Sequence, residues 1–126
     1  ITTAGVAAAQ KCPVVGVPAP SDFPGSSSLV AAYTKQFNAA PGSWSPYTYD
    51  SVMLLADAIT RAGGTSSAQL KAALAATKGW KGWTGTVAFD ATTGNRIPAP
   101  VTVDIVDASG SFHVDPAWVT ATGFTY

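Results

Sequence analysis

Apolar positions recur with the 3.6-residue period of an amphipathic helix in three stretches of the chain. The strongest pattern predicts a helix over about residues 49–62, which the pair Gly63-Gly64 can end in the left-handed conformation. The side chains expected to form its buried stripe are Val52, Leu55, Ala56, Ile59 and Ala62. A second helix is predicted over residues 29–37 behind a run of serines, and a third begins at the capping-box pattern of residues 66–69.

Elsewhere the apolar positions indicate strands. Val14-Val15 is a short continuous apolar run of the kind found in buried parallel strands. The prolines of residues 18–24 then interrupt regular pairing and indicate a stiff connector. In the last third of the chain the period changes to 2, which predicts a strand over residues 86–89 and a hairpin over residues 101–114. One face of that hairpin is expected to carry Val101, Val103 and Ile105.

The order of strand, three helices, strand and hairpin describes an α/β chain that is incomplete by itself. A parallel sheet needs several strand–helix units to cover both of its faces, and only one strand precedes the helices here. Such a chain either assembles with another one or is part of a larger protein. We favour the second interpretation.

The composition limits the classes of partner. Apolar residues make up 47% and charged residues 11% of the 126 residues, with seven basic and seven acidic side chains. A protein that binds nucleic acid electrostatically needs a surplus of basic residues, so no nucleic-acid partner is expected. The apolar stretches are too short to span a bilayer. No export signal opens the sequence, although a mature chain or an internal fragment would lack one too.

The residue types that carry catalysis or bind metals are scarce. His113 is the single histidine, so no metal-ligand spacing exists, and we expect it to be structural. Cys12 is the single cysteine, and we expect a buried or half-buried free thiol unless it pairs with a cysteine upstream of this sequence. The sequence also lacks a Gly-x-Ser-x-Gly nucleophile elbow. Neither enzymatic activity nor a bound metal or cofactor is therefore expected.

Three consecutive motifs resemble a known family. Residues 49–63 read Tyr-Asp-Ser-Val-Met-Leu-Leu-Ala-Asp-Ala-Ile-Thr-Arg-Ala-Gly, residues 70–74 form a short Leu-Ala-rich segment, and residues 80–90 contain Gly-x-Thr-Gly-x-x-x-Phe-Asp. In this order and spacing they resemble the C-terminal part of the leucine/isoleucine/valine-binding proteins, which are type I periplasmic solute-binding proteins. Ser51 stands where the family usually has alanine. The resemblance covers nearly the whole chain.

The resemblance implies an α/β fold with two doubly wound lobes joined by crossovers, of which this chain would supply the C-terminal portion. Residues 1–17 would belong to the C-terminal lobe, 18–22 to a hinge crossover and 23–97 to the N-terminal lobe. Residues 98–100 would form another hinge crossover, and 101–126 a terminal hairpin and tail on the C-terminal lobe. Both expected hinges coincide with proline-rich sequence.

The resemblance also indicates ligand-binding residues at the start of the strongest helix. Trp44 occupies the position, five residues before the helix-opening Tyr49, where family members hold an aromatic side chain against the ligand. Tyr47 and Tyr49 complete the set of candidates. The alternative for Trp44 is packing under its loop. Asp50 is expected to interact favourably with the dipole of the helix that it opens.

The implied function is that of an extracytoplasmic receptor for an ABC importer, which captures a branched-chain amino acid or a related amide or aromatic acid between its lobes. Its expected partners are the small-molecule ligand, the permease of the transporter and the remainder of the same polypeptide upstream of Ile1. The protein would be periplasmic or extracellular, either free or held by a lipid anchor outside this sequence. The alternative is a ligand-sensing regulatory module of the same fold.

Overall fold

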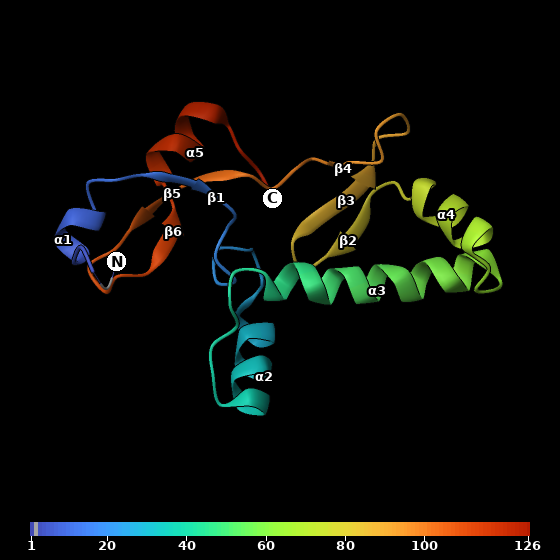
Figure 1. Cartoon of the computed structure of the whole chain (residues 1–126), viewed down its shortest axis with the longest axis horizontal. Helices are drawn as coiled ribbons and strands as arrows, with labels where there is room; N and C mark the ends of the chain where they lie inside the picture. Colours follow the sequence, from blue (N-terminus) through green and yellow to red (C-terminus); the bar gives the residue numbers. More distant parts are fainter. Residues whose placement is uncertain (2) are drawn as a thin grey trace. The chain divides into compact units, whose positions relative to one another are not determined.

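The computed structural model describes Ile1 and residues 3–126 (Figure 1). Within these residues the backbone forms five helices and six short strands. Contacts divide the chain into two compact units: unit 1 comprises Ile1–Ser43 and Pro100–Tyr126, and unit 2 comprises Trp44–Ala99. Each unit contains one three-stranded sheet whose neighbouring strands pair antiparallel.

The sheet of unit 1 has β5 at its centre. Its strands are β1 (Val14–Gly16), β5 (Thr102–Val106) and β6 (Phe112–Val114), and its helices are α1 (Val6–Ala9), α2 (Ser27–Phe37) and α5 (Pro116–Thr122). The predicted hairpin is confirmed, because Ile105 pairs with His113 across β5 and β6. The predicted buried parallel strand is wrong, because β1 pairs antiparallel with β5 and Val15 is 77% exposed.

The buried face of β5 carries Thr102, Asp104 and Val106, whereas the opposite face, assigned to Val101, Val103 and Ile105, begins at the exposed Val101. The strand alternates as predicted, but its polar side chains point inward, where Thr102 Oγ1 donates to Asp104 Oδ1 at 2.8 Å. β1 passes close to this carboxylate, because a Cβ atom on Gly16 would collide with it. Burial raises the pKa of Asp104. A hydrogen-bonded polar pair therefore lies on the buried face of β5.

The core of unit 1 is centred on Phe23, in the irregular segment between β1 and α2. Phe23 is 1% exposed, and its ring meets the ring of Tyr126 edge to face at a centroid distance of 5.3 Å. Phe124 packs against Tyr126 in the same way at 5.2 Å. The C-terminal residues therefore cover the segment that the sequence predicts to be a stiff connector.

Unit 2 combines two helices with a β-meander. The helices are α3 (Ser45–Ala62) and α4 (Ser67–Ala75), and the strands are β2 (Trp80–Gly82), β3 (Gly85–Phe89) and β4 (Arg96–Ile97). α3 packs against both α4 and β2. Its end at Gly63, with φ 65°, and the capping box between Ser66 and Gln69 are confirmed. β2 and the early start of α3 were not predicted, since residues 44–49 and 80–83 read as loops.

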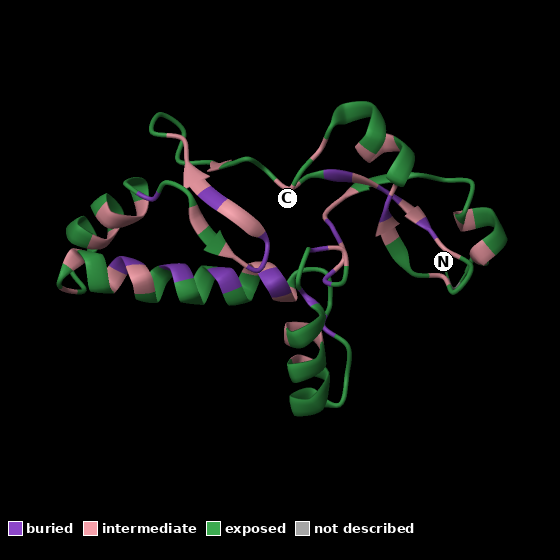
Figure 2. Cartoon of the chain, turned by 180° about the vertical axis from the view of Figure 1, so that it is seen from behind, coloured by how far each residue is buried: buried purple, intermediate pink, exposed green. Residues whose placement is uncertain are grey.

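The buried face of α3 differs from the predicted stripe. Its buried side chains are Pro46, Asp50, Leu54 and Ala58, spaced four residues apart. Figure 2 shows them as purple bands along one side of α3, with green and pink on the remainder of the helix. Val52, at the start of the predicted stripe, is 63% exposed. Apolar residues occur on both sides of α3. The side that packs is the one with Asp50 and the small Ala58. Periodicity alone therefore selected the wrong side of the helix.

Candidate ligand-binding site

Trp44 and Tyr47 lie together at the start of α3. Trp44 is the residue that precedes the helix, and its side chain is 68% exposed rather than packed under a loop. The ring of the half-buried Tyr47 lies against it at a centroid distance of 5.5 Å and an angle of 55°. Because residues three apart on a helix share a face, the pair forms one aromatic surface with Trp44 outermost.

Tyr49 lies on a different face of the helix from this pair. Its ring is 43% exposed and meets Trp83 edge to face at a centroid distance of 5.9 Å. Trp83 is 9% exposed and therefore packs in the interior of unit 2. The structure therefore brings two of the three candidate residues together and separates the third from them.

Asp50 anchors the turn between β2 and β3. Its carboxylate accepts hydrogen bonds from the backbone N–H of Trp83 at 2.7 Å, from the backbone N–H of Thr84 at 2.7 Å and from Thr84 Oγ1 at 2.5 Å. A Cβ atom on Gly82 would lie 2.5 Å from the Asp50 carboxylate, so only glycine allows this approach. The turn residues are therefore held by a carboxylate that comes from the helix.

These contacts correct the role expected for Asp50 and explain the spacing of the motifs. Asp50 is 4% exposed and holds the neighbouring turn, and the first turn of α3 has no side-chain cap. The Tyr-Asp pair of the helix and the Gly-x-Thr-Gly segment are therefore two halves of one hydrogen-bonded unit. The two glycines that flank the turn were the signal in the sequence, because they mark a close approach of the backbone to another group.

Arg96 extends this unit from β4 and was not identified from the sequence. Its guanidinium donates to Thr84 Oγ1 at 2.7 Å, to the carbonyl of Thr84 at 2.7 Å and to the carbonyl of Thr86 at 3.3 Å. Burial lowers the pKa of Arg96, and the nearby Tyr47 and Asp50 oppose this effect. The sequence shows only an arginine near a turn. It does not show whether the guanidinium forms hydrogen bonds within the protein or is solvated.

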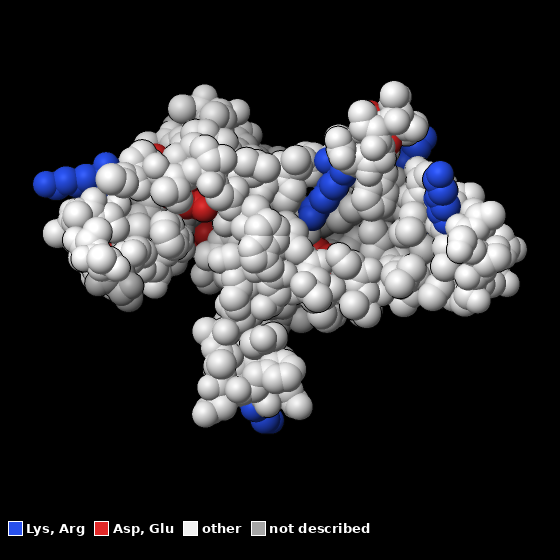
Figure 3. Space-filling model, viewed as in Figure 1, with Lys and Arg blue, Asp and Glu red and all other residues white. Residues whose placement is uncertain are grey.

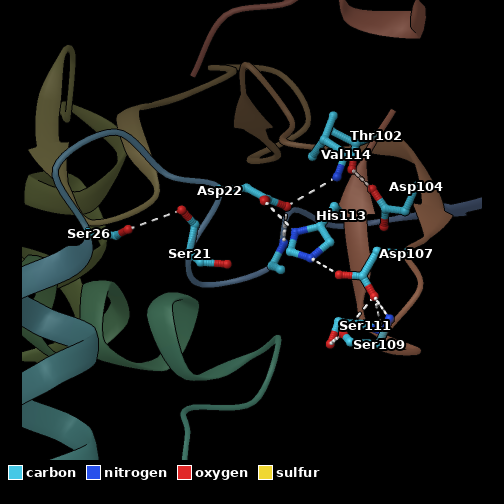
Figure 4. A network of polar contacts seen from close by, with 11 residues as sticks. Ser21, Asp22, Ser26, Thr102, Asp104, Asp107, Ser109, Ser111, His113 and Val114 are labelled. Atoms are coloured by element: carbon cyan, nitrogen blue, oxygen red, sulfur yellow. Dashed lines mark hydrogen bonds and ion pairs between the residues drawn. The ribbon is translucent and has the colours of Figure 1, made fainter. Parts of the chain in front are cut away.

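A second polar network lies in unit 1, where Asp22 and Asp107 flank the single histidine (Figure 4). His113 Nδ1 lies 3.2 Å from Asp22 Oδ1, and His113 Nε2 lies 3.1 Å from Asp107 Oδ2. The second oxygen of Asp22 accepts from the backbone N–H groups of Val114 and Ala19. The network ties the expected crossover at residues 18–22 to β6, so His113 has the structural role that was predicted.

The stability of unit 1 is expected to depend on the protonation of His113. Its hydrogen bond to Asp22 raises the pKa of the imidazole above 6.5, and the carboxylate of Asp107 acts in the same direction. The stabilising contribution is therefore complete below pH 6.5 and is lost as the pH rises through the raised pKa of the folded state. A His113→Gln variant should not show this decline in its melting temperature.

An NMR titration of the wild-type protein checks this expectation, with the imidazole signal of His113 assigned by its loss in His113→Gln. A midpoint above 6.5 agrees with the network, and a midpoint at or below 6.5 contradicts it.

On the acid side, the hydroxyl of Ser109 and the backbone of Ser111 lower the pKa of Asp107 to about 2. The contribution of Asp107 is therefore present above pH 3.8 and is lost as the pH falls through about 2.

The cysteine and the acidic side chains form no metal site within the part of the chain that the structure describes. Cys12 is exposed, which contradicts the expected burial of this thiol. Among the described residues, no three His, Cys, Asp or Glu side chains are grouped to hold a metal ion, and no helix is both long and apolar enough to cross a bilayer. Figure 3 shows charged side chains isolated from one another on a largely uncharged face. The aromatic surface of Trp44 and Tyr47 is suited to contact with a small apolar ligand.

Comparison with known proteins agrees with the resemblance of the motifs. Residues 1–110 match the sequence profile of a family described as periplasmic binding protein. No curated protein sequence matches the chain. Among solved structures, a leucine-binding protein from Thermotoga maritima aligns with a TM-score of 0.71 and 25% identity over 86% of this chain and 31% of its own.

Two further structures extend this comparison. An ABC transporter substrate-binding protein from Desulfitobacterium hafniense in complex with leucine aligns with a TM-score of 0.66 and 26% identity over 82% of this chain and 30% of its own. A solute-binding protein of an ABC transporter from Rhodopseudomonas palustris, in complex with 3,4-dihydroxybenzoic acid, aligns with a TM-score of 0.69 and 23% identity over 85% of this chain and 30% of its own. The last of these shows the fold alone.

The chain spans about a third of the length of these structures, as a mixed α/β segment. The matched family consists of extracytoplasmic binding proteins and not of enzymes. The family match covers most of the 126 residues, and the motifs Tyr49-Asp50 and Gly82-x-Thr84-Gly85 form one hydrogen-bonded unit. The chain belongs to the periplasmic binding protein family.

Proposed function

We propose that this chain is part of the solute-binding receptor of an ABC importer, with branched-chain amino acids as its ligand class. The observation that carries the proposal is the exposed indole of Trp44, backed by Tyr47 at the start of α3. A flat indole can cover the apolar side chain of leucine and can donate one directional hydrogen bond. The leucine complex of the Desulfitobacterium hafniense protein supports this class of ligand.

Within this proposal, residues 1–17 and 101–126 belong to the C-terminal lobe and residues 23–97 to the N-terminal lobe. Crossovers at 18–22 and 98–100 join the lobes. The second crossover is supported by the boundary of the two units between Ala99 and Pro100. Residues 23–43 belong to unit 1 within this chain, so their assignment to the N-terminal lobe rests on the resemblance alone.

The first test is a thermal-shift screen of the whole polypeptide that contains these residues. Leucine, isoleucine and valine should raise the melting temperature, because a ligand that binds only the folded state stabilises it by mass action. Amides and aromatic acids form the second part of the panel, and glutamate and lysine serve as controls. A panel in which no compound raises the melting temperature would refute the proposal, and a shift by aromatic acids alone would change the ligand class.

Replacement of Trp44 with alanine is expected to weaken leucine binding about tenfold or more, because a large aromatic anchor is lost from the site. The melting temperature without ligand should change little, since the side chain is 68% exposed. Calorimetric titration measures the affinity. Phe37→Ala is the matched control, because Phe37 is another exposed aromatic residue, at 61%, and it lies on α2. Equal affinity of the wild type and Trp44→Ala would remove Trp44 from the site.

A further inference from the structure

Trp44 precedes a helix whose first turn lacks a side-chain cap. Two residues near this end of α3 are buried instead, Pro46 and Asp50. Pro46 is packed but donates no hydrogen bond. Asp50 supplies hydrogen bonds that hold this end of α3 against the meander, beside the ring contact of Tyr49 with Trp83. It lies one turn beyond Tyr47 and the ring of Trp44 that Tyr47 supports.

The position of Asp50 depends in turn on Thr84. Thr84 is 1% exposed, and its hydroxyl donates its single hydrogen to Asp50 Oδ2. The hydroxyl oxygen of Thr84 accepts a hydrogen bond from Arg96 at 2.7 Å, while another nitrogen of the guanidinium donates to the Thr84 carbonyl at 2.7 Å. The fork of Arg96 thus fixes both the rotamer of Thr84 and its backbone. Donation from a cation also polarises the hydroxyl, which strengthens its bond to the carboxylate.

From this geometry we infer that Arg96 is a positioning residue for the ligand-binding wall, acting on Trp44 through Thr84, Asp50 and the first turns of α3. The inference rests on the proposed function where it concerns ligand affinity. All of these residues belong to unit 2, so the coupling between Arg96 and Trp44 exists within one compact body. Lysine cannot replace the fork, because one ammonium cannot hold the hydroxyl and the carbonyl of Thr84 in the same planar geometry.

A matched control exists at the other end of the same helix. Arg61 also forms a fork: it binds Asp57 at 2.7 Å, the carbonyl of Ala73 at 2.6 Å and Thr77 Oγ1 at 3.0 Å. Arg61→Lys therefore makes the same chemical change in the same unit, but it loosens the contact of α3 with α4 rather than the start of α3. If Arg96→Lys changes Trp44 and Arg61→Lys does not, the change is caused by the loss of the Arg96 hydrogen bonds.

The experiment uses the whole polypeptide labelled with 5-fluorotryptophan, in which each tryptophan, including the four of this chain, gives one fluorine resonance. The Trp44 resonance is assigned by its loss in Trp44→Phe. Arg96→Lys should shift or broaden the Trp44 resonance and lower the affinity for leucine about tenfold, as expected for loss of a buried charged hydrogen bond. Arg61→Lys should leave both unchanged. An unchanged Trp44 resonance in Arg96→Lys, or an equal change in Arg61→Lys, would overturn the inference.

A second pair of variants decides the question if Arg96→Lys fails to fold. Thr84→Val removes the hydroxyl that relays the contact and should move the Trp44 resonance, whereas Thr84→Ser keeps the hydroxyl and should restore it. Movement in both variants, or in neither, would contradict the relay. A wild-type protein that binds no compound of the panel would refute the proposed function alone, because the fluorine spectra report the positioning of Trp44 without ligand.

Discussion

Replacement of Asp50 with alanine is expected to destabilise unit 2 by about 3 kcal/mol. The substitution leaves two buried backbone N–H groups and the hydroxyl of Thr84 without their acceptor. Each unsatisfied buried group costs about 1–3 kcal/mol, and the site is too enclosed for water to replace all three contacts, since Asp50 is 4% and Thr84 is 1% exposed. Urea unfolding, followed by far-UV circular dichroism, measures the change.

Asp57→Ala is the control for this prediction. Asp57 lies on the same helix, and its salt bridge to Arg61 joins two side chains that are each more than one third exposed. A pair of this kind contributes at most about 0.5 kcal/mol, so Asp57→Ala should unfold at nearly the wild-type urea concentration. Equal losses in the two variants would show that Asp50 is not the anchor of the turn between β2 and β3.

The largest loss in unit 1 is expected from Phe23→Ala, at about 3–5 kcal/mol. Phe23 is 1% exposed and forms the edge-to-face pair with Tyr126, so its removal leaves a cavity beneath the C-terminal residues. Thermal unfolding should show a lower melting temperature. In the same variant the ring of Tyr126 should gain solvent access, because the partner that covers it is gone.

Phe112→Ala is the matched control, since Phe112 belongs to the same unit but is 43% exposed. Its loss should cost about 1 kcal/mol or less. If Phe23→Ala unfolded at the wild-type temperature, the core of unit 1 would not be centred on the segment before α2. A comparable decrease in both variants would show that exposure does not distinguish the two rings.

The end of α3 and the start of α4 were the most predictable parts of the fold. Gly63 and the box of Ser66 and Gln69 are local signals, because their effect depends on residues within one helical turn. The hairpin between β5 and β6 is local in the same sense, since a short turn joins its strands. These predictions needed no knowledge of what packs against the element.

The buried faces were not predictable, because they depend on contacts between distant residues. On α3 the apolar count favoured the side of Val52, but the packed side holds Asp50, whose partners lie more than 30 residues further along the chain. On β5 the inward residues include Asp104, which a hydrophobicity pattern assigns to solvent. In both places a polar side chain is buried because it forms hydrogen bonds in the interior. The periodicity of the sequence does not reveal the partners of these hydrogen bonds.

The candidate site was located by resemblance and not by residue chemistry. Trp44 has no periodic or motif signal of its own, and its exposure became known only with the structure. Tyr49 was grouped with Trp44 and Tyr47 because it is adjacent in sequence, although helical geometry separates their faces. Arg96 escaped notice because its partners are an ordinary turn residue, Thr84, and an ordinary strand residue, Thr86.

A leucine titration of the fluorotryptophan-labelled whole polypeptide tests the central claim most directly. The receptor account predicts that the Trp44 resonance moves in a saturable manner with a stoichiometry of one leucine per chain, while the resonance of Trp118 on α5 stays in place. If the Trp44 resonance does not respond to leucine or to any other compound of the panel, the account of this chain as the aromatic wall of a solute receptor is contradicted.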